Sequence, residues 1–170
     1  MNRVAKFERV SKNRFIEDWI ETFGGEALEA EQVYERVKLP RRATKGSAGY
    51  DFFSTLDLTL KPGESIKIPT GIRVRMREDY VLLCFPRSGL GFKYRLQLNN
   101  SVAVIDSDYY NSDNEGHIFI KITNDSKEGK VLSLKEGTAF AQGIFFQFGI
   151  TEDDDVEEVR NGGFGSTTKK

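Results

Sequence analysis

Arg87, Ser88 and Gly89 stand together in the sequence Pro-Arg-Ser-Gly and combine three kinds of donor for an anion. The guanidinium group is a planar fork that matches phosphate oxygens, serine adds a hydroxyl, and glycine leaves its backbone N–H unobstructed. The glycine-rich segment 161–167 offers a second set of hydroxyl and backbone donors. Two separate donor-rich loops favour an oligophosphate ligand, although each loop taken alone is also typical of a simple turn.

The segment 99–109 combines residue types that could read a base, pack on a sugar and accept a proton. The amide of Asn100 both donates and accepts hydrogen bonds, as recognition of a base edge requires, and Tyr109 offers a flat ring for a sugar. Asp106 follows an apolar run and could hold a water as a general base. Asp108 could do the same work, and either carboxylate could instead cap a turn.

Composition and charge exclude several functional classes. The 170 residues include 25 Lys and Arg and 26 Asp and Glu, a net charge of -1, so no summed basic field attracts long nucleic acids. A single cysteine, Cys84, and a single histidine, His117, leave no His/Cys set for structural zinc and argue against histidine-dependent nucleophiles. No apolar run approaches the roughly 18 to 20 residues of a membrane span or resembles a signal segment. We therefore expect a soluble, cytoplasmic protein with neither membrane nor stable nucleic-acid binding.

Two kinds of hydrophobic periodicity divide the chain. Apolar residues at helical spacing predict one amphipathic helix over 12–23, with Ser11 as its N-cap and a stop at Gly24 and Gly25. The stretch 26–31 is consistent with either a short helical turn or an acidic linker.

From residue 34 onward apolar side chains recur with period 2, as in 56–60, 66–68, 72–76 and 118–122. This spacing is typical of strands with one buried face. The continuously apolar runs 80–85 and 144–148 predict strands covered on both faces.

Short strands separated by frequent turns predict an all-β fold, an antiparallel sandwich or distorted barrel, with an N-terminal helical extension. We expect a helical extension over 1–33, a β core over 34–159, and a flexible glycine-rich arm over 160–170. Since no glycine-rich turn leads into a second long amphipathic helix, a doubly wound α/β sheet is not expected.

Five short motifs, in order along the chain, resemble those of the trimeric dUTPase family. They are Ser-Ala-Gly-Tyr-Asp at 47–51, Pro-Arg-Ser-Gly at 86–89, Val-Ile-Asp-Ser-Asp-Tyr at 104–109, the cluster at 137–142 and Gly-Gly-Phe-Gly-Ser-Thr at 162–167. The resemblance covers roughly residues 34–167. It implies a jelly-roll-like β fold and hydrolysis of dUTP to dUMP and pyrophosphate, with Mg²⁺ as cofactor and a homotrimer that shares its active sites.

The resemblance also implies a role for each motif position. Asp106 would activate the water that attacks the α-phosphorus, Asp51 would support the site through hydrogen bonds, and Tyr109 would pack on the deoxyribose. Uracil would be read by a hairpin that includes Asn100, Val102, Val104 and Ile105. The phosphates would be bound by Arg87, Ser88, Gly89 and Gln142. The arm would close over the nucleotide with Arg160, Phe164, Gly165, Ser166 and Thr167, and Mg²⁺ would be held by phosphates and water without direct protein ligands.

The chain departs from the family pattern at several positions. Ala103 stands where glycine is usual in the uracil hairpin, and residues 110–115 lengthen the turn before Gly116, which we interpret as a longer exposed loop. Arg160 lies one residue nearer to the last motif than is common, and Thr168 replaces its customary final glycine. The phosphate role of Arg160 is therefore less secure than that of Arg87.

Two other functions are kept as alternatives. The first is a dCTP deaminase-like enzyme, whose serine-rich arginine loop and glutamate base are not matched by Gly89 and Asp106. The second is a nucleotide-binding regulatory protein that would use the loop 110–115 and the N-terminal helix as contact surfaces. We interpret Cys84 as a core residue and His117 as a strand residue without a chemical role.

Overall fold

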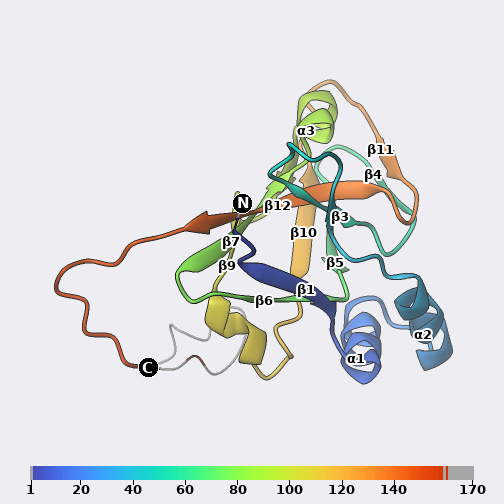
Figure 1. Cartoon of the computed structure of the whole chain (residues 1–170). Helices are drawn as coiled ribbons and strands as arrows, with labels where there is room; N and C mark the ends of the chain where they lie inside the picture. Colours follow the sequence, from blue (N-terminus) through green and yellow to red (C-terminus); the bar gives the residue numbers. More distant parts are fainter. Residues whose placement is uncertain (1, 159, 161–170) are drawn as a thin grey trace.

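Short antiparallel strands form most of the protein, with two helices at one end (Figure 1). The structure, a computed structural model, describes residues 2–158 and 160. The strands are β1 (Ala5–Arg9), β2 (Arg41–Arg42), β3 (Tyr50–Phe53), β4 (Leu58–Leu60), β5 (Ser65–Pro69), β6 (Ile72–Met76), β7 (Tyr80–Pro86), β8 (Leu96–Leu98), β9 (Ala103–Ile105), β10 (Phe119–Asn124), β11 (Leu132–Leu134) and β12 (Ala139–Gln147). The helices are α1 (Lys12–Phe23), α2 (Ala27–Arg36), α3 (Ser88–Tyr94) and the 3-10 helix η1 (Ser107–Asn111). The predicted all-β class with an N-terminal helical extension is confirmed.

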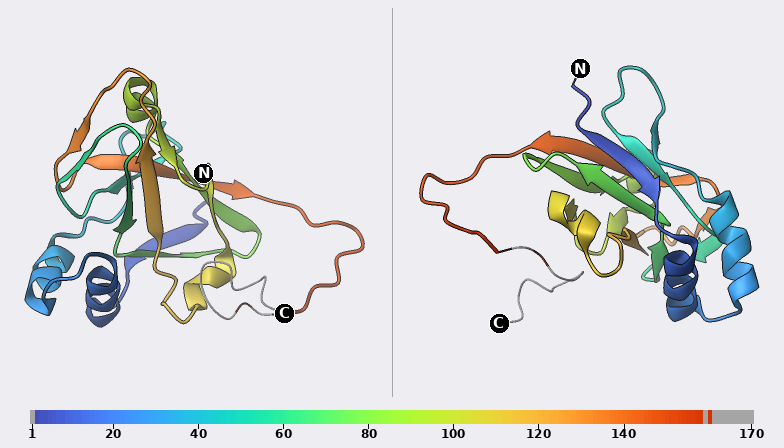
Figure 2. Two further views of the ribbon diagram at one scale, coloured as in Figure 1. Left: turned by 180° about the vertical axis from the view of Figure 1, so that it is seen from behind. Right: turned by 60° about the horizontal axis from the view of Figure 1, so that its bottom comes forward.

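The main sheet has the strand order β2-β3-β12-β7-β9, and a second sheet has the order β5-β10-β8. Two-stranded sheets, β1-β6 and β4-β11, complete the described strands. Strand β12 is central to the main sheet and pairs with β7 along its length, from Ala141 opposite Pro86 to Gln147 opposite Tyr80. Strand β10 runs across the direction of β12 in the views of Figures 1 and 2, so the two sheets lie crossed over the core.

The core is filled by the apolar side chains that alternate with polar ones along the strands, as predicted. Ile120 and Ile122 of β10 are buried while Lys121 between them is exposed, because successive side chains point to opposite faces. Cys84 on β7 is fully buried, and burial raises the pKa of its thiol to about 12, which agrees with a core role.

Strand β12 is not covered on both faces at its end. Phe146 is 43% exposed and Phe148, just beyond the strand, is 48% exposed. The prediction for 144–148 was wrong here, because a continuous apolar run does not show whether both faces are covered within one chain.

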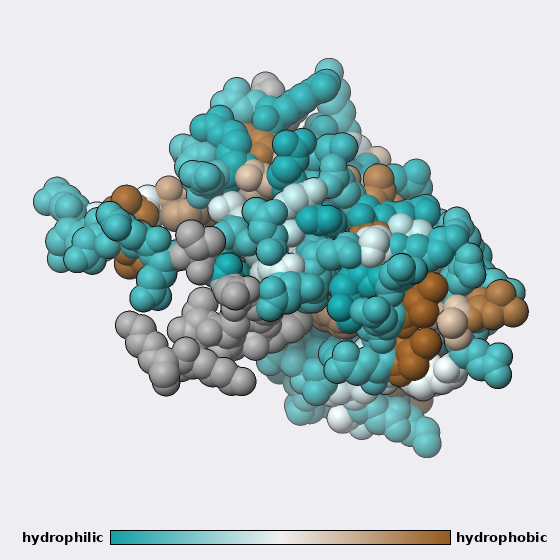
Figure 3. Space-filling model, turned by 90° about the horizontal axis from the view of Figure 1, so that it is seen from below, coloured by the Kyte–Doolittle hydropathy of each residue, from teal (hydrophilic) through white to brown (hydrophobic). Residues whose placement is uncertain are grey.

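The face seen in Figure 3 is mostly hydrophilic, with small apolar spots. Among the described residues no helix has both the length and the hydrophobicity to cross a bilayer.

The first helix begins and ends as predicted. The side chain of Ser11 accepts from the backbone N–H of Arg14, and Gly24 ends the helix with a φ of 74°. The stretch after it is a full helix, α2, rather than a short turn or linker, and it continues to Arg36, so the strands resume only at Arg41. Its sequence is rich in good helix formers, and the helix buries Ala30 and Val33 against the core.

Strand β1 was not predicted. It pairs antiparallel with β6, from Ala5 opposite Met76 to Arg9 opposite Ile72. Five residues with three charged side chains give no clear period in the sequence. What fixes the strand is tertiary: the ring of Phe7 lies 5.3 Å from that of Tyr50 and 5.6 Å from that of Phe145.

The extended turn before β10 is packed, and the prediction of an exposed loop over 110–115 was wrong in part. Ser112 is buried, as is Gly116 immediately after the loop. The carboxylate of Glu115 accepts from the backbone N–H of Ser11 at 2.7 Å and from its hydroxyl at 2.6 Å. Gly116 has a φ of +70°, and a Cβ there would lie 2.7 Å from the carbonyl oxygen of Tyr109. The loop therefore fills the space between η1 and the start of α1.

A buried carboxylate and imidazole join helix α1 to this loop. His117, fully buried, accepts at Nε2 from the backbone N–H of Gly71 at 2.8 Å, so its proton is on Nδ1, which lies 2.5 Å from Asp18 Oδ2. Burial lowers the pKa of His117 below 6.5 and keeps the ring neutral. Burial alone would raise the pKa of Asp18, but hydrogen bonds from His117 and Arg14 hold it below 3.8. His117 is thus a packing residue with a specific partner, and it lies before the strand rather than in it.

This arrangement predicts a loss of stability at mildly acidic pH. Since the pKa of His117 is lower in the folded than in the unfolded chain, the unfolded chain binds more protons below pH 6.5. We expect the free energy of unfolding to be fully present above pH 6.5 and to fall below it, by up to about 1.4 kcal/mol per pH unit. Urea unfolding between pH 7.5 and 5.5 measures this. His117→Gln should flatten the profile, and equal slopes for both proteins would contradict the assignment.

Candidate active site

The first, second and fourth motifs meet at the end of the main sheet. Arg87 follows β7 and is the N-cap of α3, and its Nε lies 3.2 Å from Asp51 Oδ1 on β3. Asp51 is in turn directly opposite Gln142 in the β3–β12 ladder. With Ser88 and Gly89, which begin α3, these residues form what we call the Arg87 cluster. The side chain of Arg87 is 43% exposed, so its guanidinium remains accessible to a ligand while Asp51 orients it.

Close backbone approach holds this cluster together. Gln142 Nε2 donates to the carbonyl oxygen of Pro86 at 3.2 Å, which ties β12 to the loop that carries Arg87. A Cβ at Gly49 would lie 2.5 Å from Gln142 Oε1. The glycine of the first motif therefore leaves room for the glutamine of the fourth, and a larger residue at position 49 would force that side chain to move.

The third motif forms a second group at the other end of β9. Asp106 and Asp108 flank the start of η1, and Arg160 binds both: its Nε donates to Asp108 Oδ1 at 2.9 Å, and a second guanidinium nitrogen binds Asp106 Oδ2. Each carboxylate is 47% exposed, whereas Arg160 is 17% exposed. We call Asp106, Asp108, Tyr109 and Arg160 the Asp106 cluster. It combines an accessible carboxylate pair with a cation.

Tyr109, in η1, is buried and held at its hydroxyl. The hydroxyl donates to the carbonyl oxygen of His117 at 2.7 Å and accepts from Asn114 Nδ2 at 2.8 Å. Burial raises the pKa of this phenol, so it stays protonated and able to donate at neutral pH. Its partners lie in and directly after the extended turn, which the sequence alone did not connect with the motif.

The predicted hairpin over 99–109 differs from a simple two-stranded ladder. Its first arm, β8, pairs with β10, and its second arm, β9, pairs with β7. The turn between them leaves Asn100 exposed beside a pocket of about 320 Å³. Val104 is exposed, while Ile105 and Ala103 are buried, so the methyl group that departs from the family pattern points into the core. Val102 is half-buried at the end of the turn.

The strand register separates the two clusters within one chain. Cys84 lies opposite Ala103 and Leu82 opposite Ile105, which places Asp106 level with residue 81. Arg87 is six residues farther along β7. At about 3.3 Å per strand residue, the two groups are about 20 Å apart. One chain by itself does not bring the candidate base to the candidate phosphate donors.

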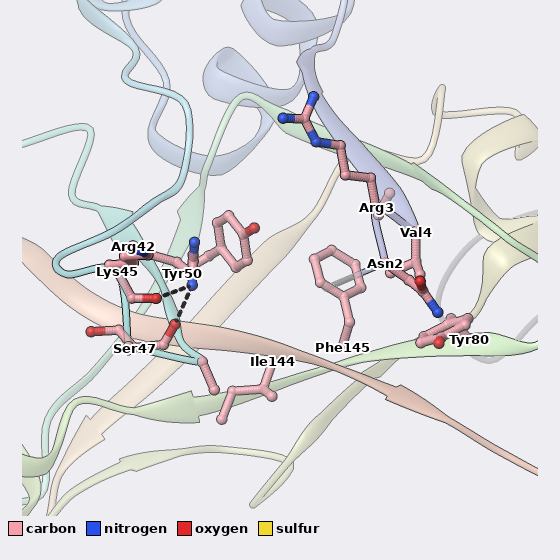
Figure 4. Close-up of a pocket in the computed structure, with 13 residues that line it drawn as sticks. Asn2, Arg3, Val4, Arg42, Lys45, Ser47, Tyr50, Tyr80, Ile144 and Phe145 are labelled. Atoms are coloured by element: carbon pink, nitrogen blue, oxygen red, sulfur yellow. Dashed lines mark hydrogen bonds between the residues drawn. The ribbon is translucent and has the colours of Figure 1, made fainter.

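A cavity of about 830 Å³ lies away from both clusters. Figure 4 shows its aromatic floor, Tyr50 and Phe145, with Arg3 on one side and Arg42 on the other. Tyr50 precedes Asp51 on β3, and successive strand side chains point to opposite faces, so this cavity and the Arg87 cluster occupy opposite faces of the sheet. A second cavity, of about 770 Å³, is lined by Asp106 and Asp108.

Of the predicted site residues, the structure brings Asp51, Arg87, Ser88, Gly89 and Gln142 together at one end of the sheet. It brings Asp106, Tyr109 and Arg160 together at the other. Phe164, Gly165, Ser166 and Thr167 lie outside the described residues. The contact of Arg160 with both aspartates was not expected from the sequence, because 52 positions separate Arg160 from Asp108.

Comparison with known proteins identifies the family. The family model described as dUTPase matches residues 35–168. The chain is 42% identical over 134 residues to the deoxyuridine 5′-triphosphate nucleotidohydrolase of Lactococcus lactis, with 77% of this chain and 88% of the relative covered. It is 41% identical over 140 residues to the enzyme of the same name from Paraburkholderia xenovorans, with 79% and 91% covered.

Solved structures agree. The crystal structure of dUTPase from Streptococcus mutans superposes with a TM-score of 0.63 at 31% identity, covering 86% of this chain and 98% of that one. A mutant dUTPase from phage phi11 of S. aureus has a TM-score of 0.62 at 23% identity, with 92% and 98% covered, and supports the fold alone. Because the family model spans most of the chain and the sequence relatives match over most of their own length, the chain belongs to the dUTPase family, the enzymes that hydrolyse dUTP.

Proposed function

We propose that this chain converts dUTP to dUMP and pyrophosphate by attack of water on the α-phosphorus, with Asp106 as the general base. The observation that carries the assignment is the position of its carboxylate, at the end of a buried strand and 47% exposed. Within the described residues the side chain does not cap η1, and the partner shown for its carboxylate is Arg160. A general base needs this combination of rigid backbone and accessible oxygen.

Arg160 binds the carboxylate of the proposed base. An arginine held against a carboxylate occupies an oxygen that would otherwise accept a hydrogen bond from water. Phosphate oxygens compete for the same guanidinium group, because arginine binds both in a forked geometry. We infer that substrate phosphates draw Arg160 from Asp106 and Asp108, which frees the base only when nucleotide is present. This exchange gives Arg160 its phosphate role.

The Arg87 cluster supplies the phosphate donors. A triphosphate carries several negative charges, and a carboxylate base is repelled unless they are offset. Arg87 provides a cation whose direction is fixed by Asp51, while Ser88, Gly89 and Gln142 add neutral donors. The arm residues Phe164, Gly165, Ser166 and Thr167 are proposed to close over base and phosphates.

The Asn100 turn and the β9 backbone are proposed to recognise uracil. Thymine differs by one methyl, which an apolar pocket rejects by only about 1 to 3 kcal/mol, so close main-chain approach must add steric exclusion. Val104 and Ile105 lie on β9, the strand that would make this approach, and Val102 lies at the end of the turn before it. Cytosine presents a different hydrogen-bonding edge, and a mismatched buried group costs about 1 to 3 kcal/mol more.

Mg²⁺ is the proposed cofactor, and the residues present fit a metal bound through the substrate. Mg²⁺ prefers oxygen ligands and keeps several waters, commonly pairing substrate phosphates with few protein ligands. Asp106 and Asp108 offer accessible hard oxygens that can accept hydrogen bonds from such waters. When bound, the ion offsets phosphate charge. The phage phi11 relative has been described with a structural Mg(II) ion.

A homotrimer with shared sites is proposed from the separation of the clusters. About 20 Å along one sheet is too far for a single nucleotide phosphate to contact both Arg87 and Asp106. If a neighbouring copy places its Asp106 cluster beside the Arg87 cluster of the first copy, both groups can contact the same nucleotide. Exposed apolar side chains at the end of β12, including Phe146 and Phe148, are available for contact between copies.

We further propose a cytoplasmic location.

Replacing Asp106 tests the base. We expect Asp106→Asn to lower kcat for dUTP by about 10²- to 10⁴-fold with a nearly unchanged Kd, because a neutral amide cannot accept the proton. Asp108→Asn, which has the same exposure and the same Arg160 contact, should cause a smaller loss. Single-turnover kinetics with Mg²⁺ separate binding from chemistry. A larger loss for Asp108→Asn would move the role to that residue.

Mixing two inactive variants tests the shared site. Arg87→Ala and Asp106→Asn should each be inactive alone, whereas unfolding and refolding them together in equal amounts should restore activity at about a quarter of the sites, where both intact residues meet. Mass measurement in solution gives the subunit number. A monomer with full activity, or a mixed sample that stays inactive, contradicts sharing.

The alternatives predict other products. Release of ammonia from dCTP would indicate a deaminase, and tight nucleotide binding without turnover would indicate a regulatory protein. Family membership and the relatives' dUTP-hydrolysing names favour hydrolysis of dUTP.

A further inference from the structure

Helix α1 reaches the Asp106 cluster through two connected hydrogen-bonding steps. We propose that Asp18 and His117 are positioning residues that fix the place of Tyr109 and thereby set the preference for deoxyribose over ribose nucleotides. The inference rests on the proposed function, in which Tyr109 packs on the sugar. Asp18 and His117 touch neither the substrate nor Asp106, and they act through the extended turn.

The hydroxyl of Tyr109 is bound by residues of this turn and by the residue that follows Gly116. It donates to the carbonyl oxygen of His117 at 2.7 Å and accepts from Asn114 Nδ2 at 2.8 Å. Asn114 is fixed in turn, since its side-chain oxygen accepts from the backbone N–H of Gly116 at 3.2 Å. A shift of the turn therefore moves the tyrosine ring.

The turn is fixed from the N-terminal side. His117 binds Asp18 through Nδ1 at 2.5 Å, and Arg14 on the same helix holds that carboxylate at 2.6 Å. Two residues earlier, Glu115 accepts both the backbone and the hydroxyl of Ser11 at the start of α1. Through Ser11 and Asp18, helix α1 therefore contacts Glu115 and His117, the two ends of the segment 115–117. This segment cannot shift along the helix while α1 stays packed in place.

A second brace holds the other side of η1. The guanidinium carbon of Arg73 lies 3.6 Å from the ring centroid of Tyr110, and Arg73 donates to the carbonyl oxygen of that tyrosine at 2.8 Å. The hydroxyl of Tyr110 donates to Glu8 on β1 at 2.7 Å. Strand β1 thus holds Tyr110 of η1 directly, whereas helix α1 acts on the neighbouring Tyr109 through His117.

A sugar-packing ring discriminates by contact distance. A ribose carries one hydroxyl more than a deoxyribose, and a ring packed against the 2′ carbon excludes it only while the ring cannot retreat. Apolar contact alone rejects an added hydroxyl weakly, by about 100-fold. The rigidity of Tyr109 therefore matters more for rejecting UTP than for binding dUTP. Loosening the turn should reduce selectivity before it reduces the chemical step.

The test measures kcat/KM for dUTP and for UTP in the full-length protein with Mg²⁺. Asp18→Ala should reduce the ratio of the two values by about tenfold, within the range of remote coupling, with kcat for dUTP nearly unchanged. Asn114→Ala, at a half-buried turn position where folding is less at risk, should reduce the ratio similarly. Glu17→Ala is the matched control: Glu17 lies on α1 and pairs with Arg14 but is 65% exposed, so the ratio should stay unchanged.

A double-mutant cycle separates positioning from general stability. Tyr109→Phe keeps the ring but removes the hydroxyl, so adding Asn114→Ala to it should have little further effect on the ratio. Independent, additive losses would overturn the proposal, as would an unchanged ratio in both Asp18→Ala and Asn114→Ala. Tyr109→Ala gives the distinction from the proposed function: if it leaves the ratio unchanged, Tyr109 does not read the sugar. If only Tyr109→Ala lowers the ratio, the sugar role stands and the positioning inference fails.

Discussion

The antiparallel register of β7 and β9 is the constraint on which the rest of this enzyme depends. It fixes Asp106 level with residue 81 and leaves Arg87 at the far end of the same strand pair. A hydrogen-bonded ladder cannot slip by one residue without turning every buried side chain outward, so this separation is rigid. If Asp106 and Arg87 act on one nucleotide, as proposed, one of them has to come from another copy or from a large rearrangement. The exposed apolar end of β12 supports the proposal of another copy.

Rigidity at the Arg87 cluster has a different origin. There the ladder between β3 and β12 places Asp51 opposite Gln142, and Gly49 permits the glutamine to lie against the first motif. The ion pair between Arg87 and Asp51 is partly exposed, so its direct contribution to stability is small. In the proposed function its value lies in orientation, because it fixes the direction of the guanidinium group before a phosphate binds. The site is preorganised by backbone pairing, and side-chain ion pairs refine it.

Much of this was predictable from the sequence, and the exceptions share a cause. The helix over 12–23 and the alternating strands were predicted because the spacing of their apolar residues is visible within a short stretch of sequence. Strand β1 and the burial of the turn around Gly116 escaped because their partners, β6 and the start of α1, lie far away in the chain. The motif residues could be assigned to donors and acceptors, but their division into two distant clusters required the β7–β9 register, which no local pattern contains.

The pairing of Arg160 with Asp106 and Asp108 offsets the negative charge of the two carboxylates. Two carboxylates on neighbouring turns of chain repel each other and would repel a triphosphate more strongly. A cation that is only 17% exposed between them stabilises the empty site without fixing it permanently, because its two partners remain half accessible. Incoming phosphate oxygens present the same forked geometry with more negative charge. In the proposed mechanism the substrate would displace the contact that occupies Asp106, and this exchange would couple hydrolysis to the presence of the full triphosphate.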